Sequence, residues 1–181
     1  MKILTLDTAT HTGWCLTEDG MVVAYGLIRL DAHIAAGASG SYQTEPFKLA
    51  EADRAITELV ARYKPEFIVI EQPHLRGSVS FFTVAIYGIV ELISARAMTG
   101  FYPVHTQSWQ SKITPAPKGA KREKGDAKKR SVAHVRSLGI EPETDDVADA
   151  ICIAEHVWKY VQVSTGNHEF RVPSGVGSLA A

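Results

Sequence analysis

The sequence predicts an α/β fold with one mixed five-stranded sheet, in which three antiparallel strands are followed by parallel strands, flanked by helices. Two observations support this class. Short apolar runs at residues 2–7, 13–18 and 21–30 open the chain, and such runs between turn residues are typical of β-strands. From Pro46 onward, helical spacing of apolar residues alternates with further strand-like runs, which is the pattern of an α/β protein.

The elements follow in order from local signals. Asp19-Gly20 joins the second and third strands, and this pair favours a tight hairpin. Glu71 closes a Phe-Ile-Val-Ile strand, and Gly100 is placed to end a long apolar helix. The remaining expected elements are a loop at 31–46, a helix at 46–64, a strand at 67–70, a helix at 78–99, a strand at 101–106, a loop at 108–125, and helices at 126–138 and 146–161.

Length and composition bound the class of protein. With 181 residues, 45% of them hydrophobic and 22% charged, the chain suits one globular domain. We expect that domain at residues 1–162 and a flexible tail at 163–181, which is rich in Gly and Ser. No apolar run is long enough for a membrane span. Cys15 and Cys152 lie in apolar segments, which indicates buried thiols and a cytoplasmic location.

Positive charge is concentrated in one segment. Residues 112–136 hold nine Lys or Arg against two acidic residues, a local charge of +7, so the rest of the chain carries −8 for a net charge of −1. This asymmetry predicts an anion-binding surface beside an acidic site. We expect Lys128, Lys129 and Arg130 to contact phosphate, although such a run is often only the solvated face of a helix.

Four carboxylates occupy positions in the predicted elements that can lie close together in the fold. Asp7 and Glu71 each end an apolar strand, while Asp146 and Asp149 are three residues apart on the last predicted helix and so share a face. Turn formation and helix capping are the ordinary alternatives for Asp7 and Asp146. An all-oxygen cluster favours Mg²⁺ or Mn²⁺, and two such ions support phosphodiester hydrolysis.

Four segments together resemble the motifs of a known family. They are the strand ending in Asp7, the Phe-Ile-Val-Ile-Glu71-Gln72 strand, the basic segment 125–132, and Asp146-Val-Ala-Asp149-Ala150. Over residues 2–160 this set resembles the RuvC family of Holliday-junction resolvases, which have a ribonuclease H-like fold. The resemblance implies a homodimeric endonuclease that nicks opposing strands of four-way DNA junctions.

The resemblance also implies roles for individual residues. Asp7, Glu71, Asp146 and Asp149 would be the catalytic metal ligands for two Mg²⁺ ions per site, with Mn²⁺ as a substitute, and Lys112 and Lys129 would face DNA. The chain departs from the family at Asp7-Thr8-Ala9, where the family usually has Asp-Pro-Gly. It also has Pro73-His74 where the family places an aromatic wedge, so His74 is the candidate for stacking on DNA.

Other interpretations remain open from the sequence. The same fold could cleave flaps or forks, or could bind junctions without cleaving them. The stretch from Asp7 to Gly13 loosely resembles the phosphate loop of actin-like ATPases, but 181 residues are too few for the two domains those proteins need. The apolar helix at 78–99 is expected to form the dimer interface, with Ile89 facing outward, and Trp109 is expected in the core or on a base.

Overall fold

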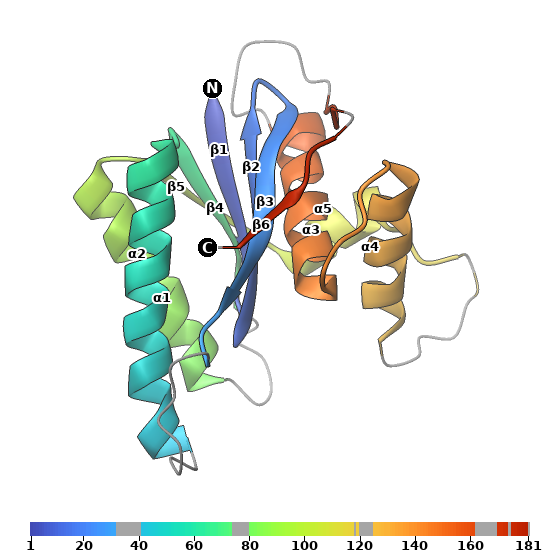
Figure 1. Cartoon of the computed structure of the whole chain (residues 1–181). Coiled ribbons are helices and arrows are strands. Elements are labelled where there is room, and N and C mark those ends of the chain that lie inside the picture. Colours follow the sequence, from blue (N-terminus) through green and yellow to red (C-terminus); the bar gives the residue numbers. More distant parts are fainter. Residues whose placement is uncertain are drawn as a thin grey trace.

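The computed structural model describes residues 1–31, 41–73, 80–117, 119, 125–161, 170–173 and 175–180. After three strands, helices and strands alternate as far as β5, as the sequence predicts, and three consecutive helices follow (Figure 1). In chain order the elements are β1 (Lys2–Asp7), β2 (His11–Glu18), β3 (Met21–Arg29), α1 (Ser41–Tyr63), β4 (Phe67–Glu71), α2 (Phe81–Ala97), β5 (Gly100–Val104), α3 (Thr106–Ile113), α4 (Asp126–Ser137), α5 (Asp145–Tyr160) and β6 (Ser178–Ala180).

The strands form one mixed sheet in the order β5-β4-β1-β2-β3-β6. β1, β2 and β3 are antiparallel neighbours, whereas β4 and β5 run parallel to β1. The predicted five strands are therefore confirmed. A sixth strand, β6, adds a short parallel edge beside β3, and it lies within the segment predicted to be a tail. Its three residues, Ser-Leu-Ala, are too few to show an alternating apolar pattern, so β6 could not be predicted from local pattern.

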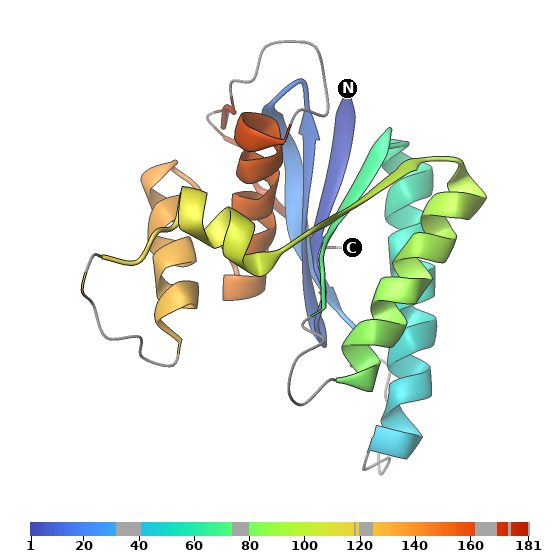
Figure 2. The same cartoon turned by 180° about the vertical axis from the view of Figure 1, so that it is seen from behind.

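Helices cover both faces of the sheet (Figures 1 and 2). α1 and α2 pack on one face, whereas α5 lies on the other and carries α3 and α4 on its outer side. Side chains alternate along each strand. Leu4 and Leu6 of β1 accordingly join the core under α1 and α2, while Ile3 joins the core under α5. None of the helices in the described ranges has the length and apolarity needed to cross a bilayer.

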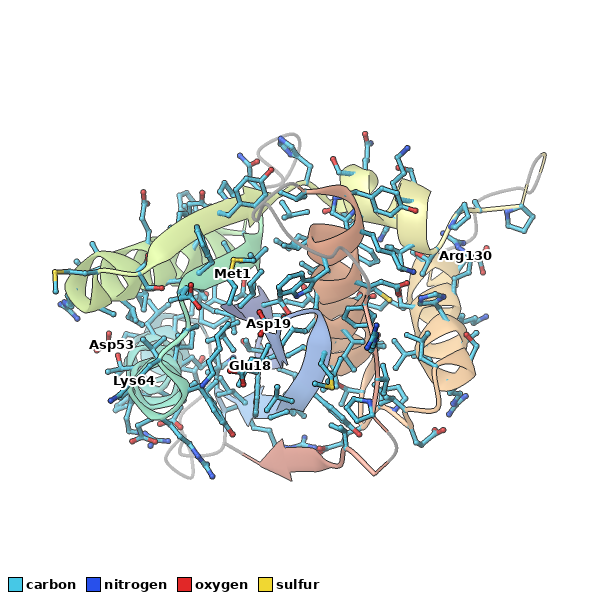
Figure 3. The ribbon with its side chains drawn as sticks, turned by 90° about the horizontal axis from the view of Figure 1, so that it is seen from above. Met1, Glu18, Asp19, Asp53, Lys64 and Arg130 are labelled. Atoms are coloured by element: carbon cyan, nitrogen blue, oxygen red, sulfur yellow. The ribbon has the colours of Figure 1, made fainter. Side chains whose placement is uncertain are left out.

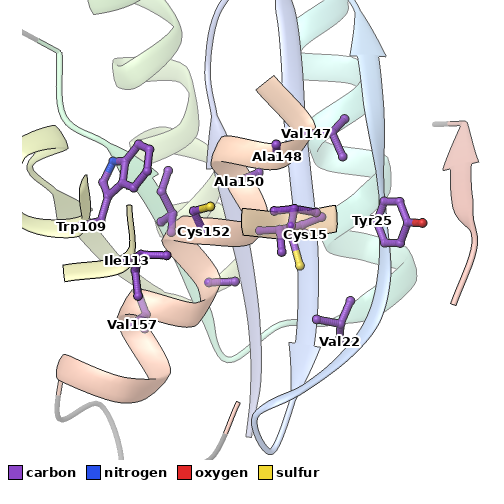
Figure 4. Close-up of a cluster of buried hydrophobic side chains, with 14 of the residues drawn as sticks. Cys15, Val22, Tyr25, Trp109, Ile113, Val147, Ala148, Ala150, Cys152 and Val157 are labelled. Atoms are coloured by element: carbon purple, nitrogen blue, oxygen red, sulfur yellow. The ribbon is translucent and has the colours of Figure 1, made fainter. Parts of the chain in front are cut away.

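α5 is the central helix of the second layer, and nearly all of its side chains are buried. Figure 4 shows Cys152, Val147 and other α5 residues packed against the sheet around Cys15. Two buried hydrogen bonds fix the helix to the strands. The Thr5 hydroxyl donates to the carbonyl of Ala150 at 2.9 Å, and the Trp158 indole donates to the Thr17 hydroxyl at 2.6 Å.

The end of β1 remote from Asp7 is also fixed. Asp19 and Gly20 both have positive φ, as the predicted Asp-Gly hairpin requires. The amino group of Met1 donates to the Asp19 carboxylate at 2.5 Å, and Figure 3 shows these two residues side by side. β1 is thus held along its length and presents Asp7 from a rigid strand.

Two sequence predictions were wrong. α1 begins at Ser41 rather than at Pro46, so residues 41–46, expected in a loop, are helical. Pro46 lies in the second turn, so its missing N–H removes one hydrogen bond near the start of the helix, which the remaining length of this 23-residue helix tolerates. A further helix, α3, spans Thr106–Ile113 and occupies the first part of the expected 108–125 loop. The Pro and Gly residues that indicated a loop all lie after α3 ends at Ile113.

Candidate active site

Asp7 and Glu71 lie at the carboxyl ends of two adjacent parallel strands. β1 pairs with β4 in a register that aligns Leu6 with Ile70, so the residues that follow each of them are neighbours. Ile68 and Ile70 belong to the core under α1 and α2, whereas Val69 belongs to the core under α5. By the same alternation, the side chains of Asp7 and Glu71 project toward the α5 face.

The amino end of α5 supplies the other two carboxylates. Thr144 caps the helix, because its hydroxyl accepts the backbone N–H of Val147 at 3.3 Å. Asp146 and Asp149 follow within the first turn and a half, and both are buried, with 8% and 7% of their surface exposed. Burial of both acids shows that they are more than solvated capping residues, since unpaired carboxylates are rarely buried.

Gly13 brings this helix end close to the strands. It pairs with Asp7 across the β1–β2 ladder. A Cβ atom on Gly13 would lie 2.0 Å from the backbone oxygen of Asp146 and 2.6 Å from the backbone nitrogen of Val147. The first turn of α5 therefore rests directly on the backbone of β2. Sequence reasoning missed this role, because a glycine needed for close approach looks the same as one needed for a turn.

The four carboxylates form one electrostatic cluster. Burial raises the pKa of Asp7 well above its ordinary value, and the negative charges of Glu71, Asp149 and Asp146 raise it further. Burial also raises the pKa of Asp149 to about 7, with an added contribution from Glu71 and opposing contributions from Ser131 and Lys128. Side chains from β1, β4 and α5 thus concentrate negative charge that the protein only partly compensates.

Lys128 is the cation that partly compensates this charge. Its ammonium group on α4 lies 2.7 Å from Asp145 Oδ2 and 3.0 Å from Asp146 Oδ1. Partial burial lowers the pKa of Lys128, but the hydrogen bonds to the two aspartates outweigh this and raise it overall. Lys128 therefore stays charged and belongs to the acidic site.

Glu71 is held by two neutral donors that sequence reasoning did not assign to it. The Thr106 hydroxyl donates to Glu71 Oε1 at 2.7 Å, and the Trp109 indole donates to Oε2 at 2.8 Å. Trp109 is completely buried, which confirms its expected place in the core. Both donors come from α3, the helix that the sequence did not predict.

The cluster has the chemistry of a divalent-cation site. Carboxylate oxygens are the ligands that hard cations prefer. Asp149 Oδ1 is buried and finds no hydrogen-bond partner among the described residues, so one ligand atom remains unused. No three His, Cys, Asp or Glu side chains in the described ranges are already close enough to hold one ion.

The predicted phosphate-binding residues have different environments. Lys112 and Lys129 are exposed, and the ammonium group of Lys112 lies 5.7 Å from the centre of the Tyr160 ring. Arg130 is partly buried, and its Nε donates to the carbonyl of Thr114 at 3.0 Å, so it links α4 to the end of α3. His74, the predicted stacking residue, lies outside the described residues.

The fold and the site together define a class. Two adjacent parallel strands of a mixed sheet end in carboxylates that face two more carboxylates at the start of a helix. Solved structures share this architecture. Thermus thermophilus RuvC matches with a TM-score of 0.61 at 16% identity, covering 85% of this chain and 91% of that one. The structure of T. thermophilus RuvC in complex with a Holliday junction substrate matches with a TM-score of 0.61 at 17% identity, and the match covers 85% of this chain and 90% of that one. The predicted ribonuclease H-like fold is confirmed.

Sequence comparison identifies the family. A scan against models of protein families finds no match. The crossover junction endodeoxyribonuclease RuvC of Corynebacterium diphtheriae is 30% identical over 125 residues, which cover 67% of this chain and 74% of that protein. The protein of the same name from Corynebacterium glutamicum is 33% identical over 115 residues, which cover 62% of this chain and 50% of that protein. The chain belongs to the RuvC family.

Proposed function

We propose that this protein is a crossover junction endonuclease that resolves four-way DNA junctions by divalent-metal-dependent hydrolysis. The proposal is supported by the negative charges of Glu71, Asp146 and Asp149, which act on the buried Asp7 from two other elements, in a chain of the RuvC family. The relatives are named for this activity, and one structural neighbour was solved with a Holliday junction. Buried, reduced Cys15 and Cys152 are consistent with a cytoplasmic location.

The four carboxylates would hold the metal, for which we propose two Mg²⁺ ions, with Mn²⁺ as a substitute. When bound, such ions activate a water molecule for attack on phosphorus and stabilise the leaving oxygen. The protein itself supplies position and charge. β1 and β4 fix Asp7 and Glu71 on adjacent strands, and α5 presents Asp146 and Asp149 against them. Lys128 offsets part of the charge repulsion at Asp146.

The DNA backbone would approach along α3 and α4. Lys112 and Lys129 are exposed on these two helices, which also contribute the side chains that hold Glu71 and Asp146. Lys129 has no ion pair with any residue in the described part of the chain, so its charge is available to a phosphate. Arg130 is engaged with Thr114 and therefore contributes less directly.

We propose that the protein acts as a homodimer that pairs through α2. Phe81, Val84 and Leu92 are exposed by 85%, 37% and 48% and, with Gly88, follow the spacing of one helix face. An added Cβ on Gly88 would meet nothing within 4 Å. A bare apolar stripe favours association, and a two-fold dimer suits a junction with two equivalent strands. Ile89, expected to face outward, is instead partly buried against the core.

The proposed chemistry is tested by charge removal at constant shape. Asp7→Asn and Asp149→Asn should abolish Mg²⁺-dependent cleavage of a synthetic four-way junction, because each removes a metal ligand. Both should still bind the junction, since phosphate repulsion falls. Asp53→Asn is the control, because Asp53 lies half-exposed on α1, remote from the four carboxylates, and forms an ion pair with Arg96 of α2. Near-normal cleavage by Asp149→Asn contradicts the proposal.

A further inference from the structure

Glu71 differs from the other three carboxylates in how it is held. Both of its oxygens accept a hydrogen bond from a neutral side chain, Thr106 Oγ1 at 2.7 Å and Trp109 Nε1 at 2.8 Å. Asp146 is instead held by the ammonium group of Lys128, and Asp149 Oδ1 has no partner in the described chain. Neutral donors orient a carboxylate while its charge stays available to a cation.

Trp109 is suited to fix a neighbour because it cannot move itself. Its side chain is fully buried in the core shared with α5, close to Ile113 and Cys152, as Figure 4 shows. An indole N–H can only donate. Losing Glu71 as acceptor would leave this buried donor unsatisfied, which proteins avoid. The contact therefore constrains both partners.

The route of the chain explains why α3 reaches Glu71. β5 runs parallel to β4 in a register that places Val104 beside Glu71. Only His105 separates Val104 from the first residue of α3, Thr106. The first turn of α3 thus begins next to the end of β4. Trp109 lies three residues after Thr106, so both donors share the helix face that meets the carboxylate.

We propose that Trp109 and Thr106 are positioning residues for Glu71. They hold its carboxylate so that each oxygen has one lone pair committed to α3 and another left for a divalent cation, which Glu71 would hold together with Asp7 and the aspartates of α5. This inference rests on the proposed metal-dependent function. Outer-shell partners of this kind typically change metal affinity or activity by about 10- to 100-fold when removed.

The chain contains a matched control for the indole contact. Trp158 is also buried, and its indole also donates to a side-chain oxygen, that of Thr17, at 2.6 Å. That contact lies in the core between α5 and β2 and does not involve any of the four carboxylates. Trp109→Phe and Trp158→Phe remove the same kind of group. Thr106→Val removes the other donor at nearly constant volume and serves if Trp109→Phe does not fold.

The test uses the full chain without DNA. In spectra that resolve the indole N–H groups, Glu71→Gln should move the Trp109 signal and leave that of Trp158 in place. Added Mg²⁺ should raise the melting temperature of the unmodified protein. Trp109→Phe and Thr106→Val should need about 10- to 100-fold more Mg²⁺ for half of that rise, whereas Trp158→Phe should need the same amount as the unmodified protein.

The outcomes separate the two proposals. If the unmodified protein responds to Mg²⁺ and all three variants respond at the same concentrations, the positioning role is overturned and the proposed function stands. If Glu71→Gln leaves the Trp109 signal unchanged, the contact itself is refuted. If the unmodified protein shows neither a Mg²⁺-dependent rise in melting temperature nor cleavage, the proposed function fails.

Discussion

Gly13→Ala should disable the site although Gly13 has no side chain to contribute. Its new methyl group would meet the Asp146 carbonyl oxygen at 2.0 Å and carbon at 2.3 Å, so α5 must retreat by about 1 Å to reach a tolerable contact. The obstructing atoms belong to the backbone, which cannot rotate away. A misplacement of about 1 Å in a catalytic group can cost about 100-fold in rate. Such overpacking costs about 1–3 kcal/mol in stability.

Two measurements check this prediction. Single-turnover cleavage of a four-way junction in Mg²⁺ should slow by about 100-fold, and the melting temperature should fall by about 2–4 °C for each kcal/mol lost. Gly177→Ala is the matched control, because an added Cβ there meets nothing within 4 Å. A Gly13→Ala protein that melts and cleaves like the Gly177→Ala control would refute the close contact between β2 and α5.

Three further outcomes are expected. Asp149 has a pKa raised to about 7 in the folded state, so between about pH 4 and 7 the folded protein binds more protons than the unfolded chain. The stability of the metal-free protein should therefore fall as pH rises through this range, by up to about 1.4 kcal/mol per pH unit from Asp149. In thermal melts with chelator, the melting temperature of Asp149→Asn should fall less steeply with pH than that of the unmodified protein. Equal slopes in the two proteins would argue against a raised pKa of Asp149. Lys129→Ala should flatten the salt dependence of junction binding by about one unit of log–log slope, and an unchanged slope returns Lys129 to a solvated helix face. Leu92→Glu should change the species seen in sedimentation from dimer to monomer, whereas the control Glu58→Gln on α1 should remain dimeric. An unmodified protein that is already monomeric contradicts the preformed dimer.

The positions of the site residues at the ends of strands could be predicted from the sequence. Asp7 and Glu71 each end a run of apolar residues, and a run of this kind in an α/β chain is a buried strand whose end lies at the sheet edge. The spacing of Asp146 and Asp149 then places both on one helix face. The order of these blocks also carried the resemblance to the RuvC family, which the comparisons confirm.

What could not be predicted depends on contacts between distant segments. The contact of Trp109 with Glu71 requires that β5 lie beside β4 and that a helix begin at Thr106, and neither follows from local pattern. The prediction that the Ile89 side chain faces outward was wrong. Because α2 is apolar on most of its surface, the sequence of this helix does not show which side meets the core. Lys128 and Lys129 are equivalent in the sequence, and only the position of α4 decides which of them reaches the aspartates.

The most direct test of the proposed function is cleavage of three DNA substrates side by side. A synthetic four-way junction, a fork and a linear duplex of matched sequence are incubated with the unmodified protein, with Mg²⁺ or with chelator, and the nicks are mapped. We expect Mg²⁺-dependent, paired nicks on opposing strands of the four-way junction and little cleavage of the fork and the linear duplex. Equal cleavage of all three substrates, or cleavage of the junction in chelator, would contradict it.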